Sequence, residues 1–143
     1  MTSLCAPRKP MHHEHCFGCG TKNPSGLHLK LAQDGPDAVA GTFVLRSDLQ
    51  GPPEIGHGGV LALALDEAMS LLIHVRGTTA RTAALAIEYH APAPVGARLE
   101  VRASLVSMAG SRLYIQGSVF RADRPRPLAT GTATFVAIGG DAP

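Results

Sequence analysis

The pattern of hydrophobic and polar positions predicts strands on either side of one long helix. Apolar side chains alternate with polar or small ones in residues 27–32 and again in residues 39–45. This two-residue period is typical of half-buried strands. The turn-forming sequence Asp34-Gly35-Pro36-Asp37 separates the two runs, so together they predict a hairpin.

Residues 60 to about 75 predict a helix, because they consist mostly of good helix formers. This segment is apolar nearly all round, so most of its faces should be buried, and Gly77 is a plausible C-terminal cap. Four further strand patterns follow, in residues 82–90, 99–105, 113–119 and 129–138. The order predicts an α+β fold, with a long central helix wrapped by a curved antiparallel sheet of five to six strands.

Composition narrows the class of protein. The chain has 143 residues, which suits one domain, and its net charge of +2 gives no reason to expect a nucleic-acid partner. The longest apolar run, residues 60–65, is far too short to span a membrane. Without a signal-peptide pattern, and with an odd number of cysteines, the chain is expected to be cytoplasmic. Residues 1–25 predict an irregular N-terminal arm, and residues 26–143 the single domain.

Glycines at the start of the helix are the first sign of function. The sequence Gly56-His57-Gly58-Gly59 opens an apolar helix, although each glycine there costs about 1 kcal/mol relative to alanine. Glycine allows a ligand to approach the backbone, and a helix start presents N–H groups that have no internal partner. Such a place suits an anion, or an oxygen that becomes negative during a reaction. A hinge or a tight packing point would also explain the glycines.

Two acidic residues, Asp66 and Glu67, lie inside the same apolar helix, where a carboxylate is costly unless it is paired or used. Nine residues separate His57 from Asp66, which places them on opposite faces of a helix and about 13.5 Å apart along it. They cannot both contact one reacting bond within one chain. If both are catalytic, the site must combine two chains, as two antiparallel helices around a two-fold axis would allow.

The chain resembles hotdog-fold acyl-CoA thioesterases, in particular the phenylacetate-pathway type. The resemblance runs through most of the chain, and its specificity comes from the order of the motifs. They are Cys16-Phe17-Gly18-Cys19-Gly20, Asn23-Pro24-Ser25-Gly26-Leu27, His57-Gly58-Gly59, Asp66-Glu67, Thr82, Tyr89 with Pro92, Pro94 and Gly96, and Ala129, Gly131 and Phe135 in the final strand.

This resemblance implies a homodimer with a continuous sheet, or a homotetramer, that hydrolyses acyl-CoA without a cofactor. The amide of Gly58 or Gly59 would polarise the thioester carbonyl, and His57 would hold the helix start or orient the thioester. Asp66 of another chain would act as general base or as nucleophile. Thr82 matches a hydroxyl residue that positions water or the acid.

Further residues are expected to bind substrate. Ser70, one turn after Asp66, is a second hydroxyl candidate, and Glu67 is its acidic neighbour. Several relatives carry Asn or Gln shortly before the histidine, and either Gln50 or Glu54 can fill that role here. A protein that binds acyl-CoA without hydrolysing it, as a sensor or carrier, is the alternative function, because a fold does not fix an activity.

The N-terminal arm carries a pair of cysteines with the spacing of zinc ligands. Cys16 and Cys19 follow His12, His13 and His15, and two of these histidines could complete a four-ligand site. The resemblance covers this stretch without implying a metal, so no metal is expected and the cysteines would pack on the sheet. A metal-dependent interaction module is the rival interpretation of the arm.

Overall fold

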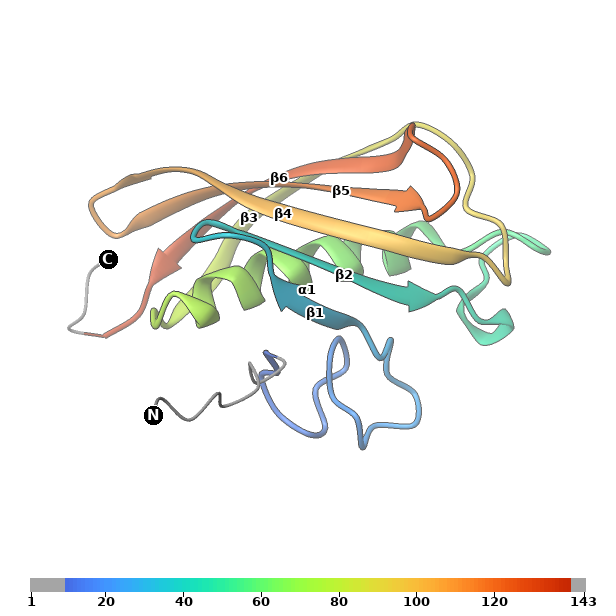
Figure 1. The fold of residues 1–143 in the computed structure, drawn as a ribbon, viewed down its shortest axis with the longest axis horizontal. Coiled ribbons are helices and arrows are strands. Elements are labelled where there is room, and N and C mark those ends of the chain that lie inside the picture. The colour runs from blue at the N-terminus through green and yellow to red at the C-terminus, as the bar shows by residue number, and fades with distance from the viewer. Residues whose placement is uncertain (1–9, 140–143) are drawn as a thin grey trace, which may run out of the picture.

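The computed structural model describes residues 10–139. Within them, one α-helix lies against a single six-stranded sheet (Figure 1). A short 3-10 helix, Ser47–Leu49, precedes the α-helix. The elements in chain order are β1 (Lys30–Gln33), β2 (Ala38–Val44), α1 (Gly58–Val75), β3 (Ala80–Tyr89), β4 (Arg98–Ala109), β5 (Arg112–Arg121) and β6 (Pro127–Ala137).

The strands lie in the order β1-β2-β4-β5-β6-β3, and each neighbouring pair is antiparallel. The strand that follows the helix, β3, therefore lies at one edge of the sheet, beside β6. The other edge is the short β1. This architecture confirms the α+β prediction of a long helix wrapped by a curved antiparallel sheet, with six strands.

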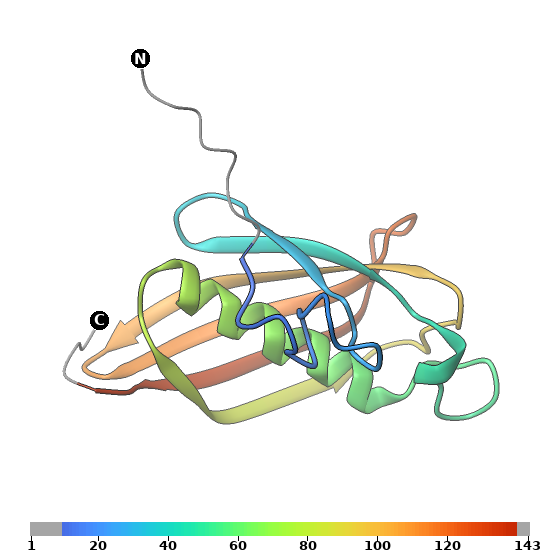
Figure 2. The same ribbon diagram turned by 90° about the horizontal axis from the view of Figure 1, so that it is seen from below.

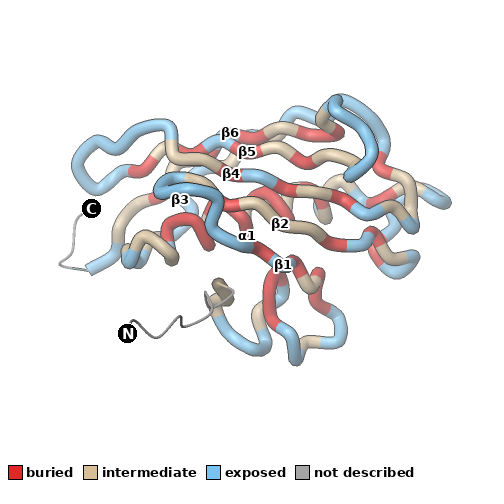
Figure 3. The backbone as a smooth tube through the Cα atoms, viewed as in Figure 1, coloured by how far each residue is buried: buried red, intermediate tan, exposed pale blue. Residues whose placement is uncertain are grey.

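The core lies between α1 and one face of the sheet, where buried residues from both layers meet (Figure 3). Leu65 of α1 is fully buried under two glycines, Gly117 and Gly131, that pair across β5 and β6. A Cβ atom at Gly117 would lie 3.0 Å from the Leu65 side chain, and one at Gly131 would lie 3.4 Å from it. These glycines therefore let the helix pack closely on the middle of the sheet.

The helix begins two residues earlier than its pattern predicts and ends as expected. The turn after Arg76 has Gly77 at φ +79°, and the N–H groups of Gly77 and Thr78 donate to the carbonyls of His74 and Ile73. This is the Schellman arrangement that glycine favours. By length and composition α1 is apolar enough to cross a membrane. Its packing between the sheet and the arm accounts for that composition.

The first strand is shorter than its pattern predicts. Leu27, Leu29 and Leu31 are all buried, as the alternation indicates, but β1 begins only at Lys30. His28 has φ +57°, a left-handed conformation that breaks an extended strand. The N–H groups of Leu27 and Leu29 instead donate to carbonyls of the arm, at Phe17 and Gly18.

The described part of the N-terminal arm, residues 10–25, crosses the face of α1 opposite the sheet (Figure 2). The arm contains no helix or strand. Its Cys19 is 5% exposed and belongs to the same hydrophobic core as the helix. The helix is thus covered on two sides, by the sheet and by the arm.

Candidate active site

A hydrogen bond joins Asp66 of α1 to Thr82 of β3. The Thr82 hydroxyl donates to Oδ1 of Asp66 over 2.8 Å. Asp66 is only partly buried, so one side of its carboxylate stays within reach of water. A carboxylate held by a hydroxyl at the edge of solvent is suited to accept a proton or to attack a carbon.

An irregularity in β3 turns Thr82 toward the helix. Residues directly opposite each other in an antiparallel pair point to the same face of the sheet. Thr82 pairs with Phe135, which is fully buried, whereas Ala84 pairs with Thr134 on the outer face. The register shifts between Thr82 and Ala84. Simple alternation would place Thr82 with Ala84 on the outer face, so the bulge is what brings its hydroxyl to Asp66.

His57 caps the start of α1. Its backbone is extended, with φ −62° and ψ 134°, and its Nδ1 accepts a hydrogen bond of 2.8 Å from the N–H of Gly59. A Cβ atom at Gly59 would lie 3.0 Å from this nitrogen, so glycine leaves room for the ring. Because Nδ1 accepts, the neutral ring carries its proton on Nε2. The resemblance implied that either the Gly58 or the Gly59 amide binds the oxyanion. The Gly59 amide already donates its hydrogen bond to His57.

The amide of Gly58 is the remaining candidate for binding an oxygen of the substrate. Within residues 10–139 its N–H makes no hydrogen bond, whereas the next two amides bond to His57. Tyr89 lies against this residue and donates from its hydroxyl to the Gly58 carbonyl over 2.8 Å. A pocket of about 330 Å³ opens beside Gly58, lined also by Leu61, Tyr89 and His90. A free helix-start amide next to a pocket can stabilise a developing oxyanion.

Within one chain, the helix start and the Asp66–Thr82 pair remain separate. Asp66 lies eight residues after Gly58, about 12 Å along α1. Each chain therefore carries the two halves of the expected site at different places. Combining them requires the helix of a second copy.

Gln50 shapes the loop before the helix. Its side-chain oxygen accepts a 3.1 Å hydrogen bond from the N–H of Glu54. Glu54 itself has φ +66°, in the left-handed region, and the N–H of Gly51 donates to the Ile55 carbonyl. Gln50 and Glu54 are both exposed. Within residues 10–139 the Gln50 side-chain nitrogen makes no hydrogen bond, while its oxygen holds the turn in which Glu54 is left-handed.

Glu67 and Ser70, expected as substrate-binding residues, lie beneath the arm instead of beside Thr82. Nδ1 of His12 is 2.7 Å from Oε1 of Glu67, and its Nε2 is 3.0 Å from the Ser70 hydroxyl. The Cys16 thiol donates to the same Glu67 oxygen over 3.3 Å. Sequence separations of more than 50 residues hide these contacts from pattern analysis.

Burial and mutual contact shift the pKa values of His12, Glu67 and Cys19. The hydrogen bond with Glu67 raises the pKa of His12 to about 9, against the opposing effect of burial. Burial alone would raise the pKa of Glu67, but its hydrogen bonds with His12 and Cys19 outweigh it and hold that pKa below the ordinary value. Burial raises the pKa of the Cys19 thiol.

The three histidines of the arm do not act together. His13 and His15 are exposed, and the N–H of His15 donates to Nδ1 of His13 over 3.1 Å. Only His12 reaches the two cysteines, with Nδ1 at 4.0 Å from Cys16 Sγ and 3.8 Å from Cys19 Sγ. The sequence alone could not select His12 from its neighbours.

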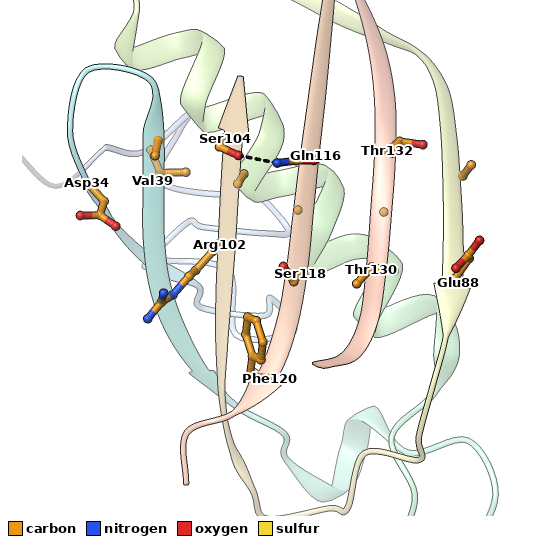
Figure 4. A pocket seen from close by; sticks show the side chains of 15 residues that line it. Asp34, Val39, Glu88, Arg102, Ser104, Gln116, Ser118, Phe120, Thr130 and Thr132 are labelled. Carbon is orange, nitrogen blue, oxygen red and sulfur yellow. Dashed lines mark hydrogen bonds between the residues drawn. The ribbon is translucent and has the colours of Figure 1, made fainter. Parts of the chain in front are cut away.

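A hollow on the outer face of the sheet is remote from these residues. It measures about 620 Å³ and lies on the outer face of the sheet, where Arg102, Gln116 and Thr130 project away from α1 (Figure 4). Neither His57 nor Asp66 lines it. We place the candidate active site at α1 because the unengaged amide and the supported carboxylate are there.

Comparison with known proteins identifies the family. The sequence profile of the thioesterase superfamily matches residues 55–128, which include the helix start, Asp66 and Thr82. A solved structure of a thioesterase superfamily protein is 30% identical, with a TM-score of 0.80 over 86% of this chain and 60% of that chain. The chain belongs to the thioesterase superfamily and has the hotdog fold. It spans less than two thirds of that relative's length.

Two further solved structures are similar to this chain. A mutant of the phenylacetic acid degradation protein PaaI from Thermus thermophilus is 26% identical, with a TM-score of 0.71 over 78% of this chain and 95% of that one. A hypothetical thioesterase from Streptococcus pneumoniae, solved with coenzyme A, is 16% identical, with a TM-score of 0.72 over 78% of this chain and 86% of that one. At this lower identity the likeness concerns the fold.

Proposed function

We propose that this protein hydrolyses the thioester bond of an acyl-coenzyme A, with a site formed by two copies of the chain. The observation that carries the proposal is the Asp66 carboxylate, held by the Thr82 hydroxyl at 2.8 Å on a helix that is otherwise mostly apolar. Membership of the thioesterase superfamily supports it. The fold is also that of proteins solved with coenzyme A or acetyl-CoA, which supports the nature of the ligand.

In the proposed reaction, Asp66 takes a proton from water while the water oxygen bonds to the thioester carbonyl carbon. The carbonyl oxygen becomes negative and accepts a hydrogen bond from the Gly58 amide of the other copy, at the positive end of its helix. When the carbonyl re-forms, the carbon–sulfur bond breaks. The coenzyme A thiolate receives the proton from Asp66, and the free acid is the second product.

Direct attack by Asp66 gives the same products in two steps. The carboxylate would displace the coenzyme A thiolate to form a mixed anhydride, which water then cleaves. Both routes need an ionised Asp66, and both use the Thr82 hydroxyl to fix its orientation. The Nε2–H of His57 remains available to orient the thioester.

The free edge of the sheet suggests how two copies would meet. β3 is an edge strand in the described chain, and most of its residues are exposed although many are small or apolar. Pairing of β3 with β3 of a second copy would extend the sheet and remove this unpaired edge. A two-fold axis there would run the two α1 helices antiparallel and bring Gly58 of one copy toward Asp66 of the other.

A panel of acyl-CoA and aryl-CoA thioesters tests the proposal, with release of free thiol as the signal. We expect turnover of at least one of them. Tight binding of acyl-CoA without thiol release from any member of the panel would favour the sensor or carrier instead. The carboxylate–hydroxyl pair supports hydrolysis, because a binding protein has no need for a base at that position.

A further inference from the structure

Four metal-binding side chains converge where the arm meets α1. Nδ1 of His12, Sγ of Cys16, Sγ of Cys19 and a carboxylate oxygen of Glu67 all lie within 4.8 Å of one another. The first three come from eight consecutive residues of the arm, and the fourth comes from the middle of the helix. Cys19 and Glu67 are buried, at 5% and 8% exposed. A carboxylate is costly to bury unless it is paired or binds a metal.

The distances among these atoms match a tetrahedral zinc site. With Zn–S at about 2.3 Å and Zn–N or Zn–O at about 2.0–2.1 Å, a tetrahedron separates sulfur from nitrogen or oxygen by about 3.5 Å. The His12 nitrogen lies 3.8 Å from Cys19 Sγ and 4.0 Å from Cys16 Sγ. Cys16 Sγ lies 3.3 Å from Glu67 Oε1. The 2.7 Å between His12 and Glu67 is shorter because a hydrogen bond joins them.

The surroundings also have the features of a metal site. His12 uses Nδ1 toward the cluster, and its other ring nitrogen is 3.0 Å from the Ser70 hydroxyl. Ligating histidines regularly hold their second nitrogen in this way, which fixes the tautomer. The N–H of His12 donates to Cys19 Sγ over 3.2 Å, and the N–H of Gly20 closes the turn onto the Cys16 carbonyl over 2.9 Å.

Two glycines of the arm make the approach possible. A Cβ atom at Gly18 would lie 2.4–2.5 Å from side-chain atoms of Glu67. One at Gly20 would lie 2.4 Å from the backbone nitrogen of Cys16. Gly18 therefore permits the contact between the cysteine turn and the helix, and Gly20 permits the close turn around Cys16.

We propose that His12, Cys16, Cys19 and Glu67 bind one zinc-type divalent cation that clamps the arm onto α1. Two thiolates and an imidazole select zinc over magnesium or calcium, which prefer oxygen ligands. Four protein ligands complete a tetrahedron and leave no open position, so the role is structural. The cation would fix Glu67, the residue next to Asp66, and thereby the helix that carries the candidate active site.

The same cluster is less suited to act as a catalytic triad for hydrolysis than to bind a metal. Ser70, His12 and Glu67 do form a hydroxyl–imidazole–carboxylate chain. However, Ser70 lies in the middle of α1, where backbone N–H groups are engaged in the helix, so no donor is available for an oxyanion. The triad also leaves the two thiols, which are as close to His12 as metal ligands would be, without a role.

Elemental analysis of the full chain, purified without chelators and without a polyhistidine tag, tests the proposal. We expect about one zinc per chain, because such sites bind tightly. Cys16→Ser, Cys19→Ser and His12→Ala should each reduce the zinc content at least about tenfold. His15→Ala is the matched control, since the exposed side chain of this histidine makes no hydrogen bond to the four described ligand residues, and it should keep the wild-type content.

A cobalt titration keeps the proposal testable if the variants fail to fold. Wild-type chain stripped of metal should bind about one equivalent of Co²⁺ and develop the visible bands of tetrahedral cobalt with thiolate charge transfer. Wild type that contains no zinc and gives no such spectrum would overturn the proposal. Thiol titration of unfolded wild type would then show whether a Cys16–Cys19 disulfide occupies the position instead.

Discussion

Thr82 reaches Asp66 only because β3 bulges between Thr82 and Ala84, which turns the hydroxyl from the outer face of the sheet onto the helix. Thr82→Val keeps the branched shape but removes the donor. We expect kcat for the best acyl-CoA to fall about tenfold or more, because a hydrogen bond to a charged group contributes about 1.5–3 kcal/mol. Steady-state kinetics with purified protein measures this.

Thr82→Ser is the matched variant. It retains the hydroxyl, so its kcat should stay within about threefold of wild type, given the larger side-chain freedom of serine. A Thr82→Val protein as active as wild type would show that the hydroxyl does not support the carboxylate.

Two variants of His57 separate its effect on stability from its effect on activity. His57→Asn supplies another side chain that caps helices well, whereas His57→Ala removes the cap and should lower the free energy of unfolding by about 1 kcal/mol. If the ring also orients the thioester, both variants lose activity, but only His57→Ala loses stability. Chemical denaturation and kinetics on the same preparations distinguish these effects. Wild-type activity in His57→Asn would confine the residue to capping.

Assembly of the site from two chains predicts complementation. Asp66→Ala and Gly58→Pro each disable one half of the site, and in a dimer of the two variants one of the two sites keeps both intact halves. Proline fits the first helical position without disturbing the helix, yet it lacks the N–H. Unfolding and refolding the mixed variants should therefore restore up to about a quarter of wild-type activity, given random pairing.

Each variant refolded alone is the control and should remain inactive. No gain on mixing, together with proof that mixed dimers had formed, would place both halves of the site in one chain.

The glycines of the arm predict a stability effect. Gly20→Ala would push a methyl group into the backbone of Cys16, and overpacking of this kind costs about 1–3 kcal/mol of unfolding free energy. The neighbouring exposed Thr21→Ala should change it by less than about 0.5 kcal/mol. Equal stability of the two variants would contradict the close packing of Gly20 against the backbone of Cys16.

Much of the fold follows from local patterns in the sequence. The order of strands and helix could be predicted from the alternating apolar residues and from the long apolar segment. Both patterns arise because these residues are buried in the core. The His57–Asp66 spacing predicts a site made by two chains if both residues are catalytic, and this stays a prediction. The pattern was wrong at the start of β1, where His28 adopts a left-handed conformation. Alternation also gives no sign of the bulge between Thr82 and Ala84, which decides the face on which Thr82 lies.

The remainder of the site depends on contacts between distant segments. Glu67 follows Asp66 directly in sequence but points about 100° away from it around the helix, whereas Ser70, four residues after Asp66, is turned by only about 40° toward Glu67. Which partner each face meets depends on how the arm crosses α1. The cysteine spacing raised the possibility of a metal. The fourth ligand atom, however, comes from Glu67 in the helix, 48 residues after Cys19 (67 − 19).

Hydrolysis of acyl-CoA by Asp66→Asn tests the central claim most directly. Asparagine keeps the shape of the side chain and can still contact Thr82, but it can neither accept a proton nor form an anhydride. With the best substrate from the panel, kcat should fall by about 10²–10⁴-fold while the protein remains folded and oligomeric. An Asp66→Asn protein that turns over substrate at the wild-type rate would contradict the account.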